Sequence, residues 1–239
     1  MFSKRSALLE LPDQRAAAKT KRQPRASKCI TMRQATNIME AVPFAKSVGL
    51  PLVAHLTIHW SLTDVGDDPD GKLFAKFREG LDKWLHRRGI EFTAAWSRER
   101  QCGGLSDVVH CHLLFYLPVE YRSGARLRQV EAAIARLVKL HGNDYWAEQV
   151  IKLVIHDTSP YPDGKYFIKG GGLKVWKKFG VRKQHRRLQG LIHGKRCGVT
   201  ENIGAAARRQ RKEQCRPFSF VRENFETAVD PARSLRARY

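Results

Sequence analysis

The sequence predicts an α+β domain built on one antiparallel sheet of four to five strands, with helices mainly on one face and a basic arm at each end. Three observations lead to this: stretches that alternate apolar and polar residues, stretches with apolar residues every three or four positions, and positive charge concentrated near the two ends. With 239 residues, 42% of them hydrophobic, the chain is long enough for one well-cored domain. We expect a basic arm over 1–45, a central domain over 46–178, and a second basic arm over 179–239 that is partly disordered or helical.

The first strand and helix follow from two hydrophobic periods. Residues 52–60, LVAHLTIHW, alternate between an apolar face and a face that carries two histidines and a threonine, which is typical of a strand with one polar side. Residues 73–88 carry apolar groups at helical spacing, and Gly89 is placed to end that helix. These apolar groups are Phe74, Phe77, Leu81, Trp84 and Leu85.

The remaining elements complete a βαββαβ order. Residues 90–99 and 108–118 alternate as two further strands, 124–140 repeats the helical spacing, and 149–157 is a fourth strand. This order is that of the ferredoxin-like or RRM-like arrangement, in which the first and third strands are central and the second lies beside the third. The ends of the first two strands and the start of the third should therefore meet at one edge of the sheet, on its polar face.

Two histidines stand one residue apart in the third strand. His110 and His112 project to the same side of a strand, at the spacing that two ligands of one ion require. The hairpin brings Glu99 opposite them with matching parity, so Glu99 is our first choice as third ligand, His59 the second and Asp107 the third. The alternative is that the histidines are hydrogen-bonded strand residues without a metal.

The charge distribution indicates a polyanionic partner. Residues 1–33 hold nine basic against two acidic residues, 34–173 hold 17 against 16, and 174–239 hold 18 against five, within a net charge of +21. Basic arms of this kind suit phosphate contacts, which give affinity without sequence choice. The residues that we expect to contact DNA are Thr57, Arg98, Arg100, Lys174, Lys177, Lys178, Arg182, Lys183, Arg186 and Arg187.

Cysteine content and hydropathy indicate the compartment. Five cysteines, with no C-x-x-C pair, favour neither a disulfide framework nor a zinc ribbon, and no apolar run approaches the length of a membrane span. We expect a cytoplasmic protein, associated with the nucleoid of a bacterial host.

Three short motifs carry a resemblance to a known family. HCHLLF at 110–115 resembles the His-hydrophobic-His motif of the HUH endonucleases, and YFIKGG at 166–171 resembles the Y-x-x-K motif of rolling-circle replication initiators. LTIHWS at 56–61 sits where those proteins have their first motif. The resemblance covers roughly residues 50 to 175, and Cys111 departs from it because a bulky aliphatic residue commonly stands between the histidines.

The resemblance implies a single-strand DNA nuclease of a plasmid or phage. Tyr166 would be the nucleophile, Lys169 would offset developing charge, and Mg²⁺ or Mn²⁺ would be the cofactor. The product would be a 5′-phosphotyrosine link at an origin, on single-stranded or hairpin DNA, with helicase and polymerase supplied by the host. We expect Tyr166 and Lys169 on one helix face, and Tyr161 away from it because Pro162 and a turn intervene. Alternatives are an HUH transposase or relaxase, or a non-enzymatic RRM-like binder of nucleic acid.

Overall fold

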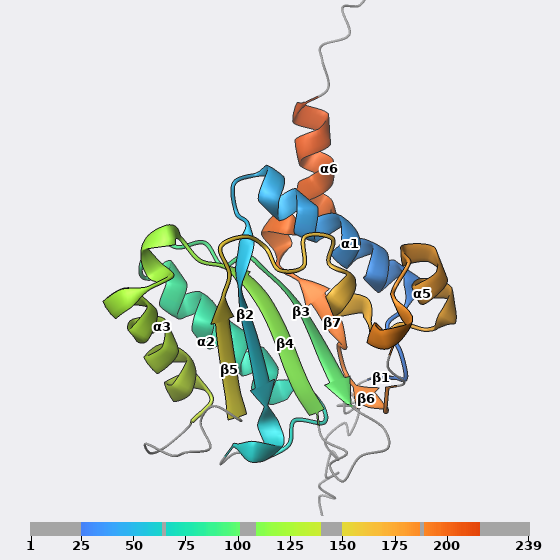
Figure 1. Ribbon diagram of the computed structural model, residues 1–239, viewed down its shortest axis with the longest axis horizontal. Coiled ribbons are helices and arrows are strands. Elements are labelled where there is room, and N and C mark those ends of the chain that lie inside the picture. Colours follow the sequence, from blue (N-terminus) through green and yellow to red (C-terminus); the bar gives the residue numbers. More distant parts are fainter. Residues whose placement is uncertain (1–24, 64–65, 101–108, 140–149, 187–188, 216–239) are drawn as a thin grey trace, which may run out of the picture.

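The computed structural model describes residues 25–63, 66–100, 109–139, 150–186 and 189–215. Its centre is an antiparallel five-stranded sheet in the order β5-β2-β4-β3-β7 (Figure 1). The strands are β2 (Leu52–His59), β3 (Ala94–Arg100), β4 (Val109–Tyr116), β5 (Ile151–Ile155) and β7 (Cys197–Val199), and β1 (Ala26–Ser27) pairs separately with β6 (Ile192–His193). The predicted α+β class with an antiparallel sheet is therefore confirmed.

Five α-helices and five short 3₁₀ turns are described around this sheet. The helices are α1 (Met32–Ser47), α2 (Lys72–His86), α3 (Gly124–Leu137), α5 (Leu173–Phe179) and α6 (Ala205–Gln214). The 3₁₀ turns are η1 (Trp60–Leu62), η2 (Val119–Tyr121), η3 (Lys165–Ile168), η4 (Lys183–His185) and η5 (Glu201–Ile203).

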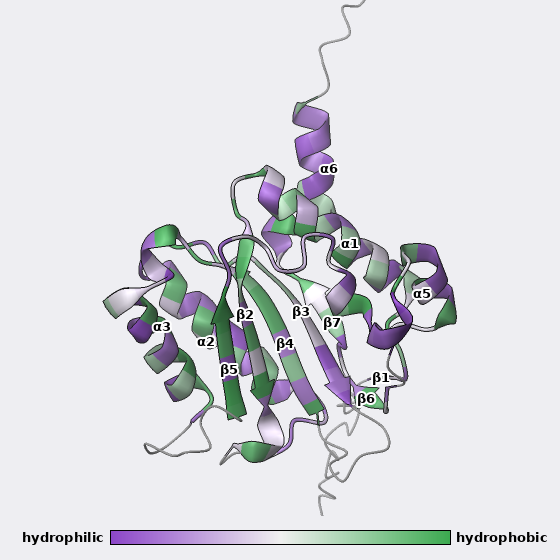
Figure 2. Cartoon of the chain, in the orientation of Figure 1, coloured by the Kyte–Doolittle hydropathy of each residue, from purple (hydrophilic) through white to green (hydrophobic). Residues whose placement is uncertain are grey.

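One face of the sheet forms the larger core with α2 and α3. Every second residue of β2 and β4 is apolar and buried there, an alternation that is visible along the strands in Figure 2. Phe74 and Phe77 of α2 pack into this layer, and each large side chain that leaves water contributes about 1.5–3 kcal/mol. Cys111 is buried in the same layer, where its Sγ accepts a hydrogen bond of 3.2 Å from Trp60 Nε1. A thiol between the two histidines is thus explained by its contact with Trp60.

The second face is covered as well, which differs from the expectation that helices lie mainly on one face. Helix α1 and turn η3 pack over it (Figure 1). The sheet residues that they bury include Ala95 of β3 and Leu114 of β4. The buried residues of α1 are Ala35, Ile38, Ala41, Val42 and Ala45. Small side chains allow this close approach, and only part of the face is left for polar groups.

The predicted N-terminal arm over 1–45 is wrong for residues 32–45. Residues 32–45 belong to α1, whose start is fixed by a capping box in which Gln34 N donates to Thr31 Oγ1 and Thr31 N donates to Gln34 Oε1. The apolar spacing of α1 together with this cap is the sequence signal that identifies it. Residues 1–24 lie outside the described part of the chain.

The predicted C-terminal arm over 179–239 contributes to the domain. Strand β7 pairs with β3 and adds the fifth strand, and α6 packs beside α1. Two buried arginines tie this segment to the rest of the domain: Arg196 donates to the carbonyl of Ser27, and Arg208 donates to Asn37 Oδ1 and Glu40 Oε2 of α1. Residues 216–239 lie outside the described part. Of the helices described, none is long and apolar enough to cross a membrane.

Candidate metal and tyrosine site

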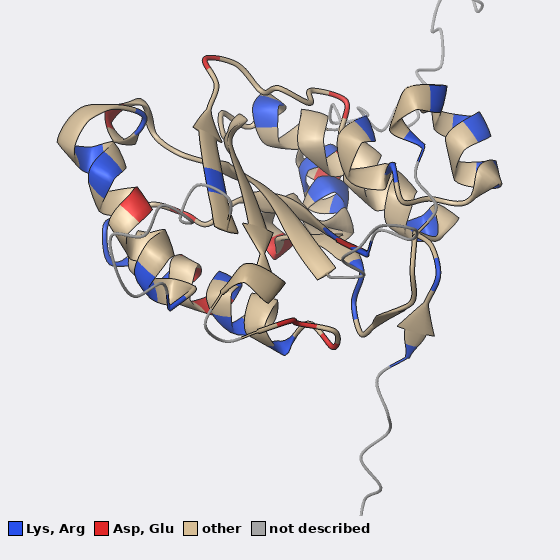
Figure 3. Ribbon diagram, turned by 60° about the horizontal axis from the view of Figure 1, so that its bottom comes forward, with Lys and Arg blue, Asp and Glu red and all other residues tan. Residues whose placement is uncertain are grey.

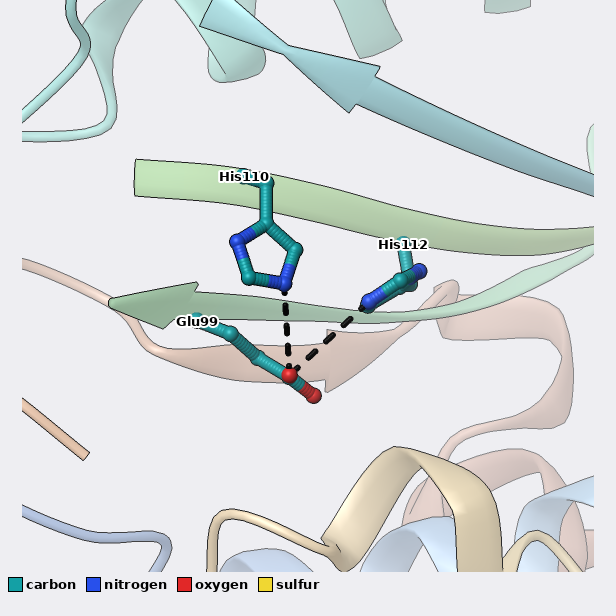
Figure 4. A group of neighbouring side chains, drawn as sticks. All are labelled: Glu99, His110 and His112. Atoms are coloured by element: carbon teal, nitrogen blue, oxygen red, sulfur yellow. Dashed lines mark ion pairs between the residues drawn. The ribbon is translucent and has the colours of Figure 1, made fainter. Parts of the chain in front are cut away.

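Strand pairing brings three side chains of the polar face together. Glu99 lies directly across from His110 in the antiparallel register of β3 and β4, and His112 is the next residue on the same side (Figure 4). This face is the one that α1 and η3 cover, opposite to the core formed with α2 and α3. The grouping follows from the twofold period of strands and the hairpin register.

The three ligand atoms are close to the spacing that an ion requires. Glu99 Oε2 lies 3.5 Å from His110 Nε2 and 3.8 Å from His112 Nε2, and all ligand atoms are within 4.8 Å of one another. Bonds of about 2.0–2.2 Å to one ion would place such atoms roughly 3.0–3.5 Å apart. In addition, Glu99 Oε1 is buried and has no hydrogen-bond partner. These residues therefore fit a divalent ion after a small contraction, and Glu99 is the carboxylate that completes the cluster.

Burial and charge set the protonation of this cluster. Burial opposes ionisation of Glu99, but the hydrogen bond with His110 and the charge of Lys169 outweigh it, so the pKa of Glu99 lies below its ordinary value. Burial, reinforced by the charge of Lys169, holds the pKa of His112 well below 6.5. An ionised carboxylate and a neutral imidazole are the forms that bind metal.

Thr57 orients the second histidine. Its Oγ1 lies 3.1 Å from His112 Nδ1, and Lys169 Nζ lies 3.4 Å from Nε2 of the same ring. An ammonium group can only donate, so Nε2 carries the lone pair and Nδ1–H donates to the hydroxyl. Thr57, predicted as a DNA contact, thus fixes the tautomer of His112, a role that partners of metal-bound histidines commonly fill.

Lys169 occupies the cation position beside these ligands. Its Nζ lies 3.1 Å from Glu99 Oε2, and its side chain is 12% exposed while that of Glu99 is 4% exposed. The ammonium group therefore faces two of the three atoms that an ion would bind. A divalent ion at this cluster would compete with Lys169 for the same oxygen and nitrogen, so its binding would have to displace the amine.

Tyr166 adjoins the cluster through Lys169. Lys169 Nζ lies 4.0 Å from the centroid of the Tyr166 ring, and the rings of Tyr166 and His112 are 5.1 Å apart. Both residues come from the segment of η3, a 3₁₀ turn that starts after Gly164, whose φ is 70°. The predicted helix is thus a single short turn, but it keeps Tyr166 and Lys169 on one side.

Tyr161 stands beside Tyr166, and the expectation that the two are separated is wrong. Their rings stack at a centroid distance of 4.3 Å with an interplanar angle of 15°. The turn at Pro162 and Gly164 folds the chain back on itself, which brings residues five apart into contact. Proline and glycine favour chain reversals of this kind. The turn from which we predicted that Tyr161 and Tyr166 are separated therefore brings their rings into contact.

His55 is a further residue of this cluster that sequence reasoning did not assign. Its ring lies 5.5 Å from His112, 5.4 Å from Tyr166 and 5.3 Å from Tyr161. Burial, with the charges of His156 and Lys169, lowers its pKa to about 4. Its place on the polar side of 52–60, with the same parity as Thr57, is the signal that could have identified it.

The other predicted ligands and one predicted DNA contact lie outside the cluster or outside the described residues. His59 stacks on His110 at 5.3 Å and lies beside the cluster rather than within it, and Asp107 is outside the described residues. Arg98 was predicted to contact DNA, which is wrong: it is buried on the α2 side and donates to the carbonyls of Asp68 and His193. Its parity is opposite to that of Glu99, which places it on the other face.

The remaining predicted DNA contacts divide by exposure. Arg100 contacts Asp67 and the carbonyl of Leu191, and Arg186 donates to the carbonyl of Val181. Arg187 lies outside the described residues. The exposed members are Lys174, Lys177, Lys178, Arg182 and Lys183, on α5 and in the turn after it.

The chain was compared with known protein families, with curated proteins and with solved structures, and none of the three comparisons found a match.

Proposed function

We propose that the protein is a metal-dependent single-strand DNA endonuclease and ligase that cuts through a tyrosine nucleophile. The observation that carries this proposal is the position of Lys169, whose Nζ lies 3.1 Å from Glu99 Oε2 and 4.0 Å from the Tyr166 ring. Lys169 thus contacts both Tyr166 and the cluster of Glu99, His110 and His112. Cleavage of a phosphodiester by a tyrosine requires the nucleophile to lie beside a group that stabilises charge on the phosphate, such as a metal ion. A sheet with only structural histidines has no need for such a pairing.

The residues of the chain supply the nucleophile and the charge balance. The Tyr166 oxygen forms a bond to phosphorus, the bond from phosphorus to the 3′ oxygen breaks, the tyrosine proton is lost and the 3′ oxygen takes up a proton. Lys169 offsets the negative charge that develops on the phosphate, an effect commonly worth 10²- to 10³-fold in rate. A metal held by Glu99, His110 and His112 would polarise the phosphate as a Lewis acid. The covalent link conserves bond energy, so the same site can rejoin ends.

The donor set favours one metal over another. Two imidazoles and one carboxylate combine the ligand preferred by the later transition metals with the ligand preferred by Mg²⁺ and Mn²⁺. Mg²⁺ binds few nitrogen ligands and keeps much of its water. Of the two ions that we expected, Mn²⁺ should therefore bind the Glu99, His110 and His112 cluster more tightly.

The exposed basic residues after Tyr166 suit the DNA strand. Lys174, Lys177, Lys178, Arg182 and Lys183 follow the nucleophile within 17 residues of sequence, and basic segments are seen on α5 at the right of Figure 3. Cations at this position would hold the phosphates on one side of the cut. The segments 1–24 and 216–239 are also basic in sequence and would add affinity that depends on salt.

The biological role that we infer is initiation of rolling-circle replication. The HUH-type motifs at 110–115 and 166–171 and the ferredoxin-like order of the four predicted strands support an initiator that works with host helicase and polymerase. The partner would be single-stranded or hairpin DNA at an origin. A transposase or relaxase would use the same site, and origin mapping would separate them.

The test is a search for the covalent adduct. The protein is incubated with single-stranded DNA of random sequence and Mn²⁺, and the labelled peptide is identified by mass spectrometry. We expect nucleotide on Tyr166, no adduct in EDTA and none with Tyr166→Phe, while Tyr121→Phe in η2 behaves as the unaltered protein. Binding without an adduct under any metal would instead favour a non-enzymatic binder.

A further inference from the structure

We propose that a pocket beside Tyr166 binds one unpaired nucleobase of the DNA strand next to the phosphate that is cut. This rests on the proposed function, and it names the part of the substrate that sets specificity. The pocket has a volume of about 290 Å³ and is formed by the turn before η3 and by the segment after α5. The lining residues that matter here are Pro160, Tyr161, Pro162, Tyr166, Arg182 and His185.

The size of the pocket limits the ligand. Pockets for small molecules usually measure about 300–1,000 Å³, so a volume of about 290 Å³ lies just below that range. One base fits such a volume, whereas a folded stretch of several nucleotides does not. The site is therefore suited to a single base that has been turned out of the strand.

The walls of the pocket suit the flat face of a base. Tyr161 and Tyr166 already form a stack at 4.3 Å, to which a base can add a further layer. Stacking on aromatic residues is worth about 1–3 kcal/mol per base, and the prolines add rigid apolar surface. This makes Tyr161 a binding residue rather than a second nucleophile.

The rim of the pocket suits the charged backbone. Arg182 is exposed at the pocket, and Lys178 is exposed at the end of the neighbouring helix α5. His185 adds a further donor. Phosphates on either side of the captured base would meet these cations, so the aromatic wall and the charged rim match the two parts of a nucleotide.

Tyr166 joins this pocket to the reaction site. It lines the pocket, and it also contacts Lys169 and lies 5.1 Å from the His112 ring. A base held against Tyr161 is therefore within one or two nucleotides of the phosphate that Tyr166 attacks. We infer that this pocket determines which nucleotide stands beside the cut.

The experiment reads base contact without cleavage. Tyr166→Phe protein in EDTA is mixed with random-sequence single-stranded DNA that carries 5-iodouracil, irradiated, and digested for mass spectrometry. We expect a crosslink on the peptide that contains Tyr161. Tyr161→Leu should weaken binding of natural random-sequence DNA about 5- to 150-fold, whereas Tyr161→Phe should keep it. The matched control is Tyr121→Leu, a half-buried tyrosine packed against the core of α2 and α3, which should leave binding unchanged.

A second variant covers the case in which Tyr161→Leu does not fold. Arg182→Ala should lower the salt slope of binding by about 0.7, while Arg128→Ala on α3 should not change it. The proposal of a base-binding pocket would be overturned if crosslinks were confined to other peptides and if Tyr161→Leu and Tyr121→Leu bound the DNA with equal affinity. A crosslink at Tyr161 in a protein that never forms a covalent adduct would support base binding in the pocket and would overturn the proposed nuclease. An adduct on Tyr166 without a crosslink at Tyr161 would support the nuclease and would overturn base binding in the pocket.

Discussion

Replacing Lys169 with methionine tests whether the amine occupies the cation position. The change keeps the length of the side chain and removes its charge, leaving Glu99 with 4% exposure and without the ammonium 3.1 Å from its Oε2. Removal of one partner from a buried ion pair typically costs about 3–5 kcal/mol. Lys169 is 12% exposed and His110 remains beside Glu99, so we expect a loss near the lower limit, about 3 kcal/mol, in the free energy of unfolding without metal.

The same change should strengthen metal binding. In the unaltered protein an ion must first displace the amine, whereas in Lys169→Met it meets a free carboxylate. If the full 3 kcal/mol or so is recovered on binding, affinity for Mn²⁺ rises by up to about 150-fold, since each 1.4 kcal/mol is tenfold. Urea unfolding in EDTA gives the first quantity, and calorimetric titration with Mn²⁺ gives the second.

The control for this experiment is Lys174→Met, an exposed lysine of α5 outside the cluster. It should change neither stability nor metal affinity. Equal Mn²⁺ affinity for Lys169→Met and the unaltered protein, or weaker affinity for the variant, would show that Lys169 does not compete with the ion and would refute this reasoning.

Three further predictions follow from particular contacts. Thr57→Val removes the acceptor of His112 Nδ1 and should weaken Mn²⁺ binding about 10- to 100-fold in calorimetry; unchanged affinity would contradict its orienting role. Gly71 and Gly49 both have a φ of +81°, so replacing either with alanine should cost about 1–2 kcal/mol of backbone strain. At Gly71 the new Cβ would in addition lie 2.5 Å from the buried guanidinium of Arg98, whereas at Gly49 it would meet nothing within 4 Å. Urea unfolding should therefore show a larger loss of unfolding free energy for Gly71→Ala. The pKa of His55 is about 4 in the folded protein and about 6.5 in the unfolded chain, so on acidification the unfolded chain takes up this proton first. The free energy of unfolding should therefore fall by about 3 kcal/mol between pH 6.5 and pH 4. If His55→Asn shows the same dependence of stability on pH, this reasoning is wrong.

The sequence was sufficient to predict the grouping of Glu99, His110 and His112 because strand geometry is local. Side chains alternate with a period of two, so His110 and His112 share a face whatever surrounds them, and the hairpin register places Glu99 opposite. The pairings of β2 with β4 and of β4 with β3 are those that the sequence predicts. The same alternation could have excluded Arg98 as a DNA contact, since its parity is that of the buried apolar face.

The covering of the second face depended on tertiary packing. Helix α1 has few large apolar residues, and its Ala and Val side chains become a core only against residues distant in sequence, such as Phe167. Strand β7 is three residues long, too short for any period to be read from the sequence, and it forms because β3 offers an unpaired edge.

The sequence by itself determined which side chains lie together as candidate metal ligands, because residue type and strand parity are properties of the local chain. Only the tertiary structure decided what stands between them. The placement of Lys169 against Glu99, the stacking of Tyr161 on Tyr166 and the position of His55 all depend on how η3 docks on the sheet. That docking is set by burial of Phe167 and Ile168 beneath α1, contacts between segments more than 100 residues apart that no local pattern specifies.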